Sequence, residues 1–253
     1  MVRKQIIAAE EDKQKQGAHY IWNEKVFRLE KISYGKELVM EFSPSDYFTS
    51  LAHRVIDPSK LGKITDWSTP AKDIYASLGI NLSLITSDGY TLITRRSAKV
   101  SFAPGHYSIS VNEAPNESDW DPKTLIIDLY KGAVRGGMEE NGTRVNGQDV
   151  NYLSLGVDRN TCQWGILGSV NLKINRREFA INLKQASDAW ESDCSNFIEW
   201  NPRSVLAKFK EYHPWTNAGR CELYHCLVHA FSQEEVDKEL VQQEISKSSF
   251  MEF

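Results

Sequence analysis

The sequence contains few cysteines and no long unbroken apolar run, and both absences narrow the possible classes of protein. Its 253 residues include only four cysteines, Cys162, Cys194, Cys221 and Cys226, and no two of them form a CxxC pair. We therefore expect reduced thiols rather than a disulfide framework. No apolar run approaches membrane-spanning length, and residues 1–16 contain no apolar core of signal-peptide length. These features predict a cytoplasmic protein with no membrane partner.

The chain also lacks an excess of positive charge, an internal repeat and a low-complexity tract. Its formal net charge is −4, so no general basic field attracts nucleic acid, and we expect no nucleic-acid partner. The hydrophobic share of 41% and the charged share of 25% are ordinary for a globular protein. The length suits one large domain, or one domain with an extension.

The first 78 residues read as a small α+β extension. Residues 1–17 form a polar helix or arm, 26–32 and 38–42 a strand pair, and 45–56 a helix. We expect a loop over 57–69 and a short helix over 70–78. This extension either packs against the main domain or builds a dimer interface.

A main domain is predicted to open at Gly79. Residues 80–86 and 90–95 are β-rich runs joined by Ser87-Asp88-Gly89, a strong hairpin signal. A turn over 103–107, a strand over 108–112 and an acidic loop follow. Later strands are expected over 153–158, 164–174 and 197–200, with a helix over 177–185.

The most informative stretch is 125–143, LIIDLYKGAVRGGMEENGT, which follows Asp121-Pro122 and ends at Gly142, a good helix C-cap. Its apolar residues recur at helical spacing and predict one broad apolar face: Ile126, Leu129, Tyr130, Ala133, Val134 and Met138. Asp128, Arg135 and Glu139 fall on the opposite face, with Glu140 beside them. Gly132 and Gly136 leave room for a bulky group against the backbone. The simplest interpretation is a solvated face with an Arg135–Glu139 pair.

The residues from Arg135 to Gly142 resemble the second half of the Nudix box, R-E-U-x-E-E-x-G-U, in which U is aliphatic. Arg135, Glu139, Glu140 and Gly142 match, whereas Gly136 replaces a glutamate and Thr143 replaces an aliphatic residue. The preceding RRS and APGHY segments follow the order of parts in Nudix hydrolases. The TSDG and ASDAWES segments look most like the UDP-sugar pyrophosphatase branch. The resemblance covers roughly residues 79–231.

This resemblance implies an α/β fold of the Nudix type, an α/β/α sandwich with a mixed sheet, preceded by the small α+β extension. The implied division is 1–78 for the extension, 79–232 for the Nudix-like domain and 233–253 for a C-terminal helix or tail. The implied activity is Mg²⁺-dependent (or Mn²⁺-dependent) hydrolysis of a nucleoside diphosphate linked to another moiety, with nucleotide sugars first. The implied partner is a nucleotide-type small molecule, and a homodimer is possible.

The resemblance implies catalytic roles for Glu139, Glu140 and Arg135. Both glutamates would be metal ligands, and Arg135 would orient them. We predict that Glu113 supplies the carboxylate missing at Gly136, and that Asp128 is a weaker candidate. Mg²⁺ prefers oxygen ligands and keeps several waters, so two or three carboxylates suffice.

Substrate contacts are predicted for Arg95, Arg96, Asn112 and Tyr107. The two arginines alternate across a strand, so only one of them faces a given side and could bind phosphate as a fork. Asn112 and Glu113 match an Asn-Glu pair of a bacterial group within the family. Tyr107, Trp164 and Trp190 either stack on a base or belong to the core.

Two other functional classes stay open beside the hydrolase. The lost glutamate suits a degenerate module that binds a nucleotide as a sensor or regulator, and the fold could also serve only as an interaction scaffold. The paired carboxylates favour the hydrolase, because they repel a phosphate unless a cation lies between them.

Two further motifs have ordinary explanations. Cys221, His225 and His229 lie on one face of a predicted helix and could hold zinc, but helix packing explains them well. The tail has apolar residues at helical spacing, Val236, Leu240, Val241 and Ile245. It forms either a helix that docks on a partner subunit or a frayed terminus.

Overall fold

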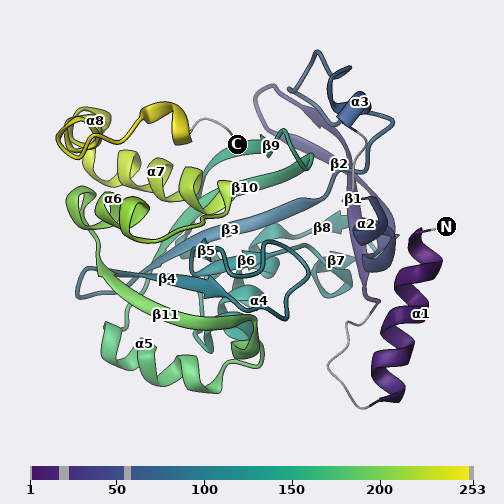
Figure 1. The fold of residues 1–253 in the computed structure, drawn as a ribbon, viewed down its shortest axis with the longest axis horizontal. Helices are drawn as coiled ribbons and strands as arrows, with labels where there is room; N and C mark the ends of the chain where they lie inside the picture. Colours follow the sequence, from purple (N-terminus) through teal and green to yellow (C-terminus); the bar gives the residue numbers. More distant parts are fainter. Residues whose placement is uncertain (1, 17–22, 54–57, 251–253) are drawn as a thin grey trace. The chain divides into compact units, whose positions relative to one another are not determined.

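The structure is a computed structural model that describes residues 2–16, 23–53 and 58–250 (Figure 1). The chain forms two compact units, each with its own internal contacts. Unit 1 comprises Met1–Leu78, Ala114–Ile127 and Val157–Trp164; unit 2 comprises Gly79–Glu113, Asp128–Gly156 and Gly165–Phe253.

Unit 1 is built around an antiparallel strand pair. The strands β1 (Lys25–Ser33) and β2 (Val39–Asp46) pair as predicted. Helices α1 (Val2–Lys15), α2 (Tyr47–His53) and α3 (Pro58–Leu61) accompany them. The helix predicted from residue 45 begins later, because Ser45 and Asp46 still pair with β1. Its predicted last residues, 54–56, lie outside the described part of the chain.

The short helix predicted over 70–78 is wrong. The backbone groups that a helix would use internally are instead bonded to β1. The Arg28 guanidinium donates to the Lys72 carbonyl at 2.9 Å, and the Leu29 amide donates to the Ala76 carbonyl at 2.9 Å. Residues 70–76 consequently run as an irregular segment, and Leu78 begins the next strand.

The acidic loop of unit 1 is more ordered than the sequence suggested. A 3₁₀ turn, η1 (Glu117–Asp119), is capped by the Asn116 side chain, and the short strands β7 (Trp120–Asp121) and β8 (Ile126–Ile127) pair. The Lys25 ammonium lies 2.6 Å from a Glu117 carboxylate oxygen and 5.2 Å from the centroid of the Trp120 ring. Ile126 is thus a strand residue and does not belong to the predicted helix.

Unit 2 contains a seven-stranded sheet with the order β11-β4-β3-β10-β9, to which β5 and β6 add beside β4 and β3. Its strands have the following bounds: β3 Leu78–Ile85, β4 Tyr90–Arg96, β5 Tyr107–Ser108, β6 Val111–Glu113, β9 Val150–Asp158, β10 Gln163–Asn171 and β11 Ser192–Glu199. The hairpin predicted at Ser87-Asp88-Gly89 is confirmed, and so are the later strands. The predicted fold class, α/β with a mixed sheet and helices, is confirmed as well.

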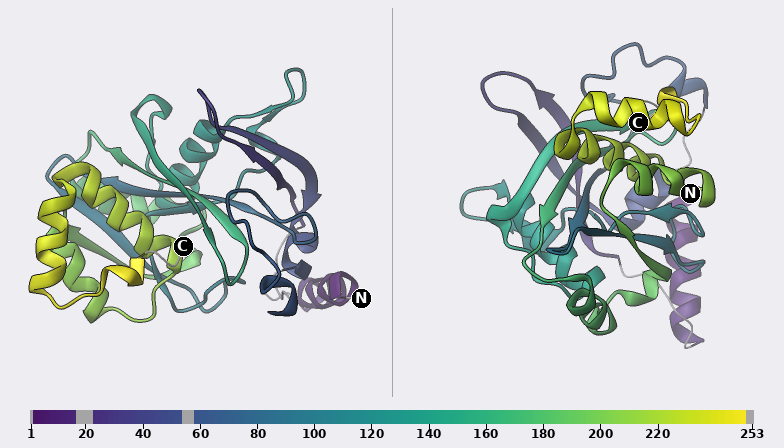
Figure 2. Two further views of the ribbon diagram at one scale, coloured as in Figure 1. Left: turned by 90° about the horizontal axis from the view of Figure 1, so that it is seen from above. Right: turned by 90° about the vertical axis from the view of Figure 1, so that its left-hand side faces the viewer.

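The helices of unit 2 form two groups. Helices α6 (Pro202–Glu211), α7 (Asn217–Phe231) and α8 (Gln233–Gln242) gather together, and α4 (Leu129–Asn141) and α5 (Arg176–Asn182) lie elsewhere along the sheet (Figures 1 and 2). The first group encloses a core that also contains Ile93 of β4, Ile198 of β11 and Ile109 from the segment between β5 and β6. Short 3₁₀ turns complete the unit: η2 Gly147–Asp149, η3 Leu183–Gln185, η4 Ala189–Glu191 and η5 Lys247–Phe250.

The predicted tail is part of this core. Val236 and Leu240 on α8 are 0% and 2% exposed and pack with residues of α6 and α7, while Val241 is 79% exposed. The apolar side of α8 is therefore covered by its own unit. The predictions of a helix docked on a partner subunit and of a frayed terminus are both wrong for α8. The Cys221 thiol donates a hydrogen bond to the Phe250 carbonyl at 2.6 Å, which ties α7 to η5.

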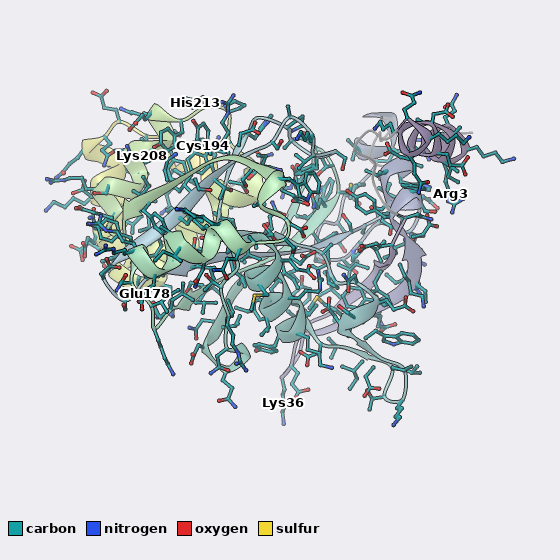
Figure 3. The ribbon with its side chains drawn as sticks, turned by 90° about the horizontal axis from the view of Figure 1, so that it is seen from below. Arg3, Lys36, Glu178, Cys194, Lys208 and His213 are labelled. Atoms are coloured by element: carbon teal, nitrogen blue, oxygen red, sulfur yellow. The ribbon has the colours of Figure 1, made fainter. Side chains whose placement is uncertain are left out.

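All four cysteines lie in the described part of the chain, and all are free thiols. Three are buried, and Cys194 lies at the surface of unit 2 together with His213 (Figure 3). Within the described residues, no helix has the length and apolar character needed to cross a membrane.

The contrast between neighbouring residues of α8 gives a direct test of this packing. We expect Leu240→Ala to lower the free energy of unfolding by about 2–5 kcal/mol, because it removes buried apolar atoms and leaves a cavity. Val241→Ala, its matched control one residue away, should change it by less than about 0.5 kcal/mol. Urea denaturation measures both, and equal effects would show that α8 is not seated on the core.

Candidate acidic active site

The central helix of unit 2, α4, begins later than the sequence predicted. The Asp128 carboxylate accepts hydrogen bonds from the amides of Tyr130 and Lys131, at 3.0 and 3.2 Å, and so caps the helix. Asp128 therefore lies at the helix start and not on the charged face. The C-cap prediction is confirmed, since Gly142 has φ 59° in the left-handed region.

The face of α4 that packs inward is its glycine face. Buried residues of the helix are Gly132, Ala133, Gly136, Gly137 and Asn141. Tyr130 and Met138 are each 49% exposed, so the predicted apolar face is wrong. Glycine lets the helix backbone approach its neighbour more closely than a longer side chain allows, and this close approach outweighs the apolar periodicity.

Gly136 is the point of closest approach to β6. A Cβ atom at this position would lie 2.7 Å from Val111 Cγ1 and 3.0 Å from Glu113 Cβ, closer than real Cβ contacts allow. The first methylene groups of Glu113 therefore lie where the side chain of residue 136 would begin. The structure thus places Glu113 beside Gly136, and the role of its carboxylate stays a prediction.

Arg135 joins two of the predicted site residues. Its Nη1 atom lies 2.8 Å from a Glu113 carboxylate oxygen and 3.0 Å from a Glu139 carboxylate oxygen. The side chains of Arg135 and Glu113 are only 13% and 18% exposed, whereas Glu139 is 39% exposed. One mostly buried guanidinium thus fixes a carboxylate from β6 and another from α4.

Glu140 is held from the other direction by a strand amide. The backbone N–H of Asn112 donates to both Glu140 carboxylate oxygens, at 3.0 and 3.2 Å. Burial raises the pKa of Glu140 well above its usual range, and the charges of Glu113 and Glu191 raise it further. The Asn112 amide and Arg96 act in the opposite direction. Glu113 and Glu191 are therefore each close enough to Glu140 to act on its charge.

Glu191 is a candidate residue that the sequence reasoning missed. Burial raises its pKa, and the charges of Asp188 and Glu139 raise it further, whereas Arg96 lowers it. Two backbone hydrogen bonds fix its segment: the Asp188 amide donates to the Glu139 carbonyl at 2.9 Å, and the Ser97 amide donates to the Glu191 carbonyl at 2.7 Å. Its only sequence signal is its position in the ASDAWES segment, which does not distinguish it from other acidic residues nearby.

The predicted substrate residues divide between two faces of the sheet. The positive charge of Arg96 lowers the pKa of Glu140 and of Glu191. Its Nε atom donates a hydrogen bond to the Phe102 carbonyl at 2.9 Å. Arg95 is directly opposite Tyr107 on one side and Cys194 on the other, so these three side chains share the opposite face. Arg96 therefore lies with the carboxylates. Asn112 reaches Glu140 only through its backbone amide, and its side chain points to Ser108 Oγ instead.

The aromatic candidates are occupied by protein contacts. The Tyr107 ring stacks on Tyr212, with centroids 4.4 Å apart and planes 14° apart, and also contacts Trp215. Trp164 is 3% exposed, and its backbone amide donates to the Ser77 carbonyl within unit 1. Trp164 is thus a core residue, and Tyr107 is part of an aromatic cluster on the face that carries Arg95.

The donor set at this site suits Mg²⁺ or Mn²⁺ in its chemistry. Glu113, Glu139 and Glu140 offer only oxygen donors, and Mg²⁺ in proteins is commonly held by one or two carboxylates with waters and substrate phosphates. Within the described residues, no three acidic, histidine or cysteine side chains are already arranged as a metal cluster. The oxygen donors of these three carboxylates are therefore of the kind that Mg²⁺ prefers.

Comparisons with known proteins give a limited result. No protein-family model matches the sequence, and no curated protein matches it. Among solved structures, DR0079 from Deinococcus radiodurans has a TM-score of 0.39 and 15% identity, over 75% of this chain and 92% of that chain. A MutT/nudix family protein from Enterococcus faecalis has a TM-score of 0.35 and 11% identity, over 54% of this chain and 46% of that chain. At these TM-scores, the function has to be inferred from the side chains of unit 2.

The close approach at Gly136 predicts an unfavourable effect of the smallest possible substitution. We expect Gly136→Ala to destabilise unit 2 by up to about 2 kcal/mol. Overpacking costs about 1–3 kcal/mol, and the gain in helix propensity offsets about 1 kcal/mol of that cost. Urea denaturation would measure the change. Gly147→Ala is the control, since its nearest contact would be an ordinary 3.5 Å from Tyr130 Cβ; a more stable Gly136→Ala protein would contradict the close approach.

Proposed function

We propose that unit 2 is a Mg²⁺-dependent hydrolase that cleaves a nucleoside diphosphate linked to another moiety. The observation that carries this proposal is the position of Glu113. Its side chain fills the space next to Gly136, and its carboxylate pairs with Arg135 at 2.8 Å. A carboxylate is thus retained at the one box position where the helix has none.

The balance of charge supports a cation at this site. Glu113, Glu139, Glu140 and Glu191 form one connected cluster, in which Arg135 pairs with Glu113 and Glu139 and Arg96 acts on Glu140 and Glu191. Carboxylates outnumber guanidinium groups in this set, so a phosphate would be repelled without an added positive charge. When bound, Mg²⁺ would polarise the phosphoryl oxygens and offset the charge that develops during hydrolysis. Glu113, Glu139 and Glu140 would hold it.

Each remaining residue has a role that follows from its position. Arg135 holds Glu113 and Glu139 in place, and the Asn112 amide holds Glu140. Arg96 is the guanidinium available to contact a phosphate on this face. Glu191 has a raised pKa because of burial and neighbouring carboxylates, which suits a general base that takes a proton from the attacking water.

A nucleotide sugar is the favoured substrate because the TSDG and ASDAWES segments are similar to the UDP-sugar pyrophosphatase branch. Attack at a phosphorus would release a nucleoside monophosphate and a sugar phosphate. A mass-spectrometric screen with UDP-glucose, ADP-ribose, dinucleotides and nucleoside triphosphates, each with Mg²⁺, Mn²⁺ or chelator, tests this assignment. Metal-dependent cleavage of a single class would identify the substrate.

One observation favours a second function, that of a nucleotide sensor. Arg135 already neutralises two of the carboxylates, and the described residues contain no preassembled metal cluster. A protein that binds a nucleotide without cleaving it would show ligand-induced stabilisation but no product in the same screen. Either result separates both functions from an interaction scaffold, which would bind no divalent cation.

The predicted metal ligands can be tested by removing charge without changing shape. We expect Glu139→Gln and Glu140→Gln each to lower metal-dependent activity by roughly 10²-fold or more, because each removes charge that holds the cation. Initial rates at saturating Mg²⁺, with a circular dichroism spectrum as a check on folding, measure the effect. Glu234→Gln on α8, an exposed glutamate, is the control. Full activity in both site variants would rule out this cation site.

The roles of Glu113 and Glu191 predict different kinetic defects. Glu191→Gln should lower kcat by roughly 10²–10⁴-fold, the usual contribution of a general base, and leave the Mn²⁺ requirement nearly unchanged. Glu113→Gln should mainly raise the Mn²⁺ concentration needed for half-maximal activity. Rates measured across a Mn²⁺ titration separate the two effects, and the same defect in both variants would contradict the division of roles.

A further inference from the structure

A second carboxyl group of unit 2 lies far from any charge that could stabilise it. Glu222 on α7 is 0% exposed, in a helix that also contributes Leu223 and Leu227 to the core. The Ser83 hydroxyl on β3 donates to its Oε2 atom at 2.9 Å, and the Cys226 thiol donates to its Oε1 atom at 3.3 Å. The Ser83 backbone amide also favours the ionised carboxylate. These neutral donors are poor replacements for the water that an ionised carboxylate loses on burial.

The surroundings of Glu222 contain no compensating cation among the described residues. Burial raises the pKa of Glu222 to about 8, and the groups that oppose this rise are Cys226 and Ser83 alone. Burial also raises the pKa of Cys226 well above its usual range, the charge of Glu222 raises it further, and a hydrogen bond with Ser169 on β10 lowers it. The thiol therefore stays protonated, and the carboxyl group is the group in this cluster that titrates near neutral pH.

We propose that Glu222, Ser83 and Cys226 form a proton-dependent latch, in which the neutral carboxyl group keeps α7 seated on β3 and its ionisation loosens the helix. The sign follows from linkage. A buried carboxyl group that binds its proton more tightly in the folded state stabilises that state fully below the pKa of the unfolded chain, about 4.3. This stabilisation is lost as the pH rises towards the folded value of about 8.

The start of α7 connects this latch to the candidate active site. The Thr216 side chain caps α7, and its Oγ1 atom lies 3.2 Å from the Ser108 Oγ atom. The Asn112 side-chain amide lies 3.5 Å from the same Ser108 Oγ atom, and the Asn112 backbone amide holds Glu140. Loosening of α7 should therefore weaken the support of Glu140; this last step rests on the proposed function.

Hydrogen–deuterium exchange of the full chain between pH 6 and 10 tests the latch without any substrate. After correction for the intrinsic pH dependence of exchange, protection of peptides within 217–231 should fall by up to tenfold per pH unit up to about pH 8, and should level off above it once Glu222 is ionised in the folded state as well. Glu222→Gln, which cannot ionise, should abolish this fall. Glu234→Gln, an exposed glutamate on α8, should behave as the wild type. An unchanged pH dependence in Glu222→Gln would overturn the latch.

A second variant keeps the test decisive if Glu222→Gln does not fold. Ser83→Ala removes a hydrogen bond that favours the ionised carboxylate, so the pH at which the fall in α7 protection levels off should shift upwards. A levelling-off point that stays in place or shifts to lower pH would contradict the latch. Peptides within 108–113 should lose protection together with α7. Full protection there while α7 loosens would overturn the connection to Glu140, whether or not the protein hydrolyses a nucleotide.

Discussion

The close approach of α4 to β6 at Gly136 is the constraint on which the candidate site depends. Because residue 136 has no side chain, Val111 and Glu113 lie directly against the helix backbone. This contact brings the Glu113 carboxylate within 2.8 Å of the Arg135 guanidinium, which also holds Glu139. A larger residue at position 136 would separate the strand from the helix and disperse the carboxylates.

The same constraint explains the concentration of negative charge. Bringing β6 and α4 together places Glu113 and Glu140 close to each other, and the segment before β11 adds Glu191. Like charges in a partly buried region are unfavourable unless protons, guanidinium groups or a cation compensate them. Arg135 and Arg96 compensate only part of this charge; under the proposed function, a bound Mg²⁺ would compensate the rest.

The sheet of unit 2 separates two different environments. On the side of the carboxylates, charged groups are partly exposed and can meet a ligand. On the side of α7, Glu222 is enclosed by the core and is hydrogen-bonded by Ser83 and Cys226. The contact of Ser108 with Thr216 and Asn112 lies at the edge where these environments meet. A change on the α7 side can therefore affect the residues that hold Glu140.

The sequence by itself determined the features that depend on local chemistry. The hairpin at Ser87-Asp88-Gly89, the helix end at Gly142 and the pairing of Arg135 with Glu139 four residues later are all set within a few residues of chain. The α/β class follows from the order of such segments. These predictions succeeded because turn geometry, capping and i, i+4 spacing need no distant partner.

The tertiary structure decided everything that depends on a distant neighbour. Periodicity assigned the apolar residues Tyr130 and Met138 to the buried face of α4, but close packing buried the glycines instead. The segment 70–78 was read as a helix, but β1 takes its carbonyl groups. Glu191 and Glu222 looked like ordinary acidic residues in the sequence, because their burial and their neighbours arise only when strands and helices far apart in the chain pack together.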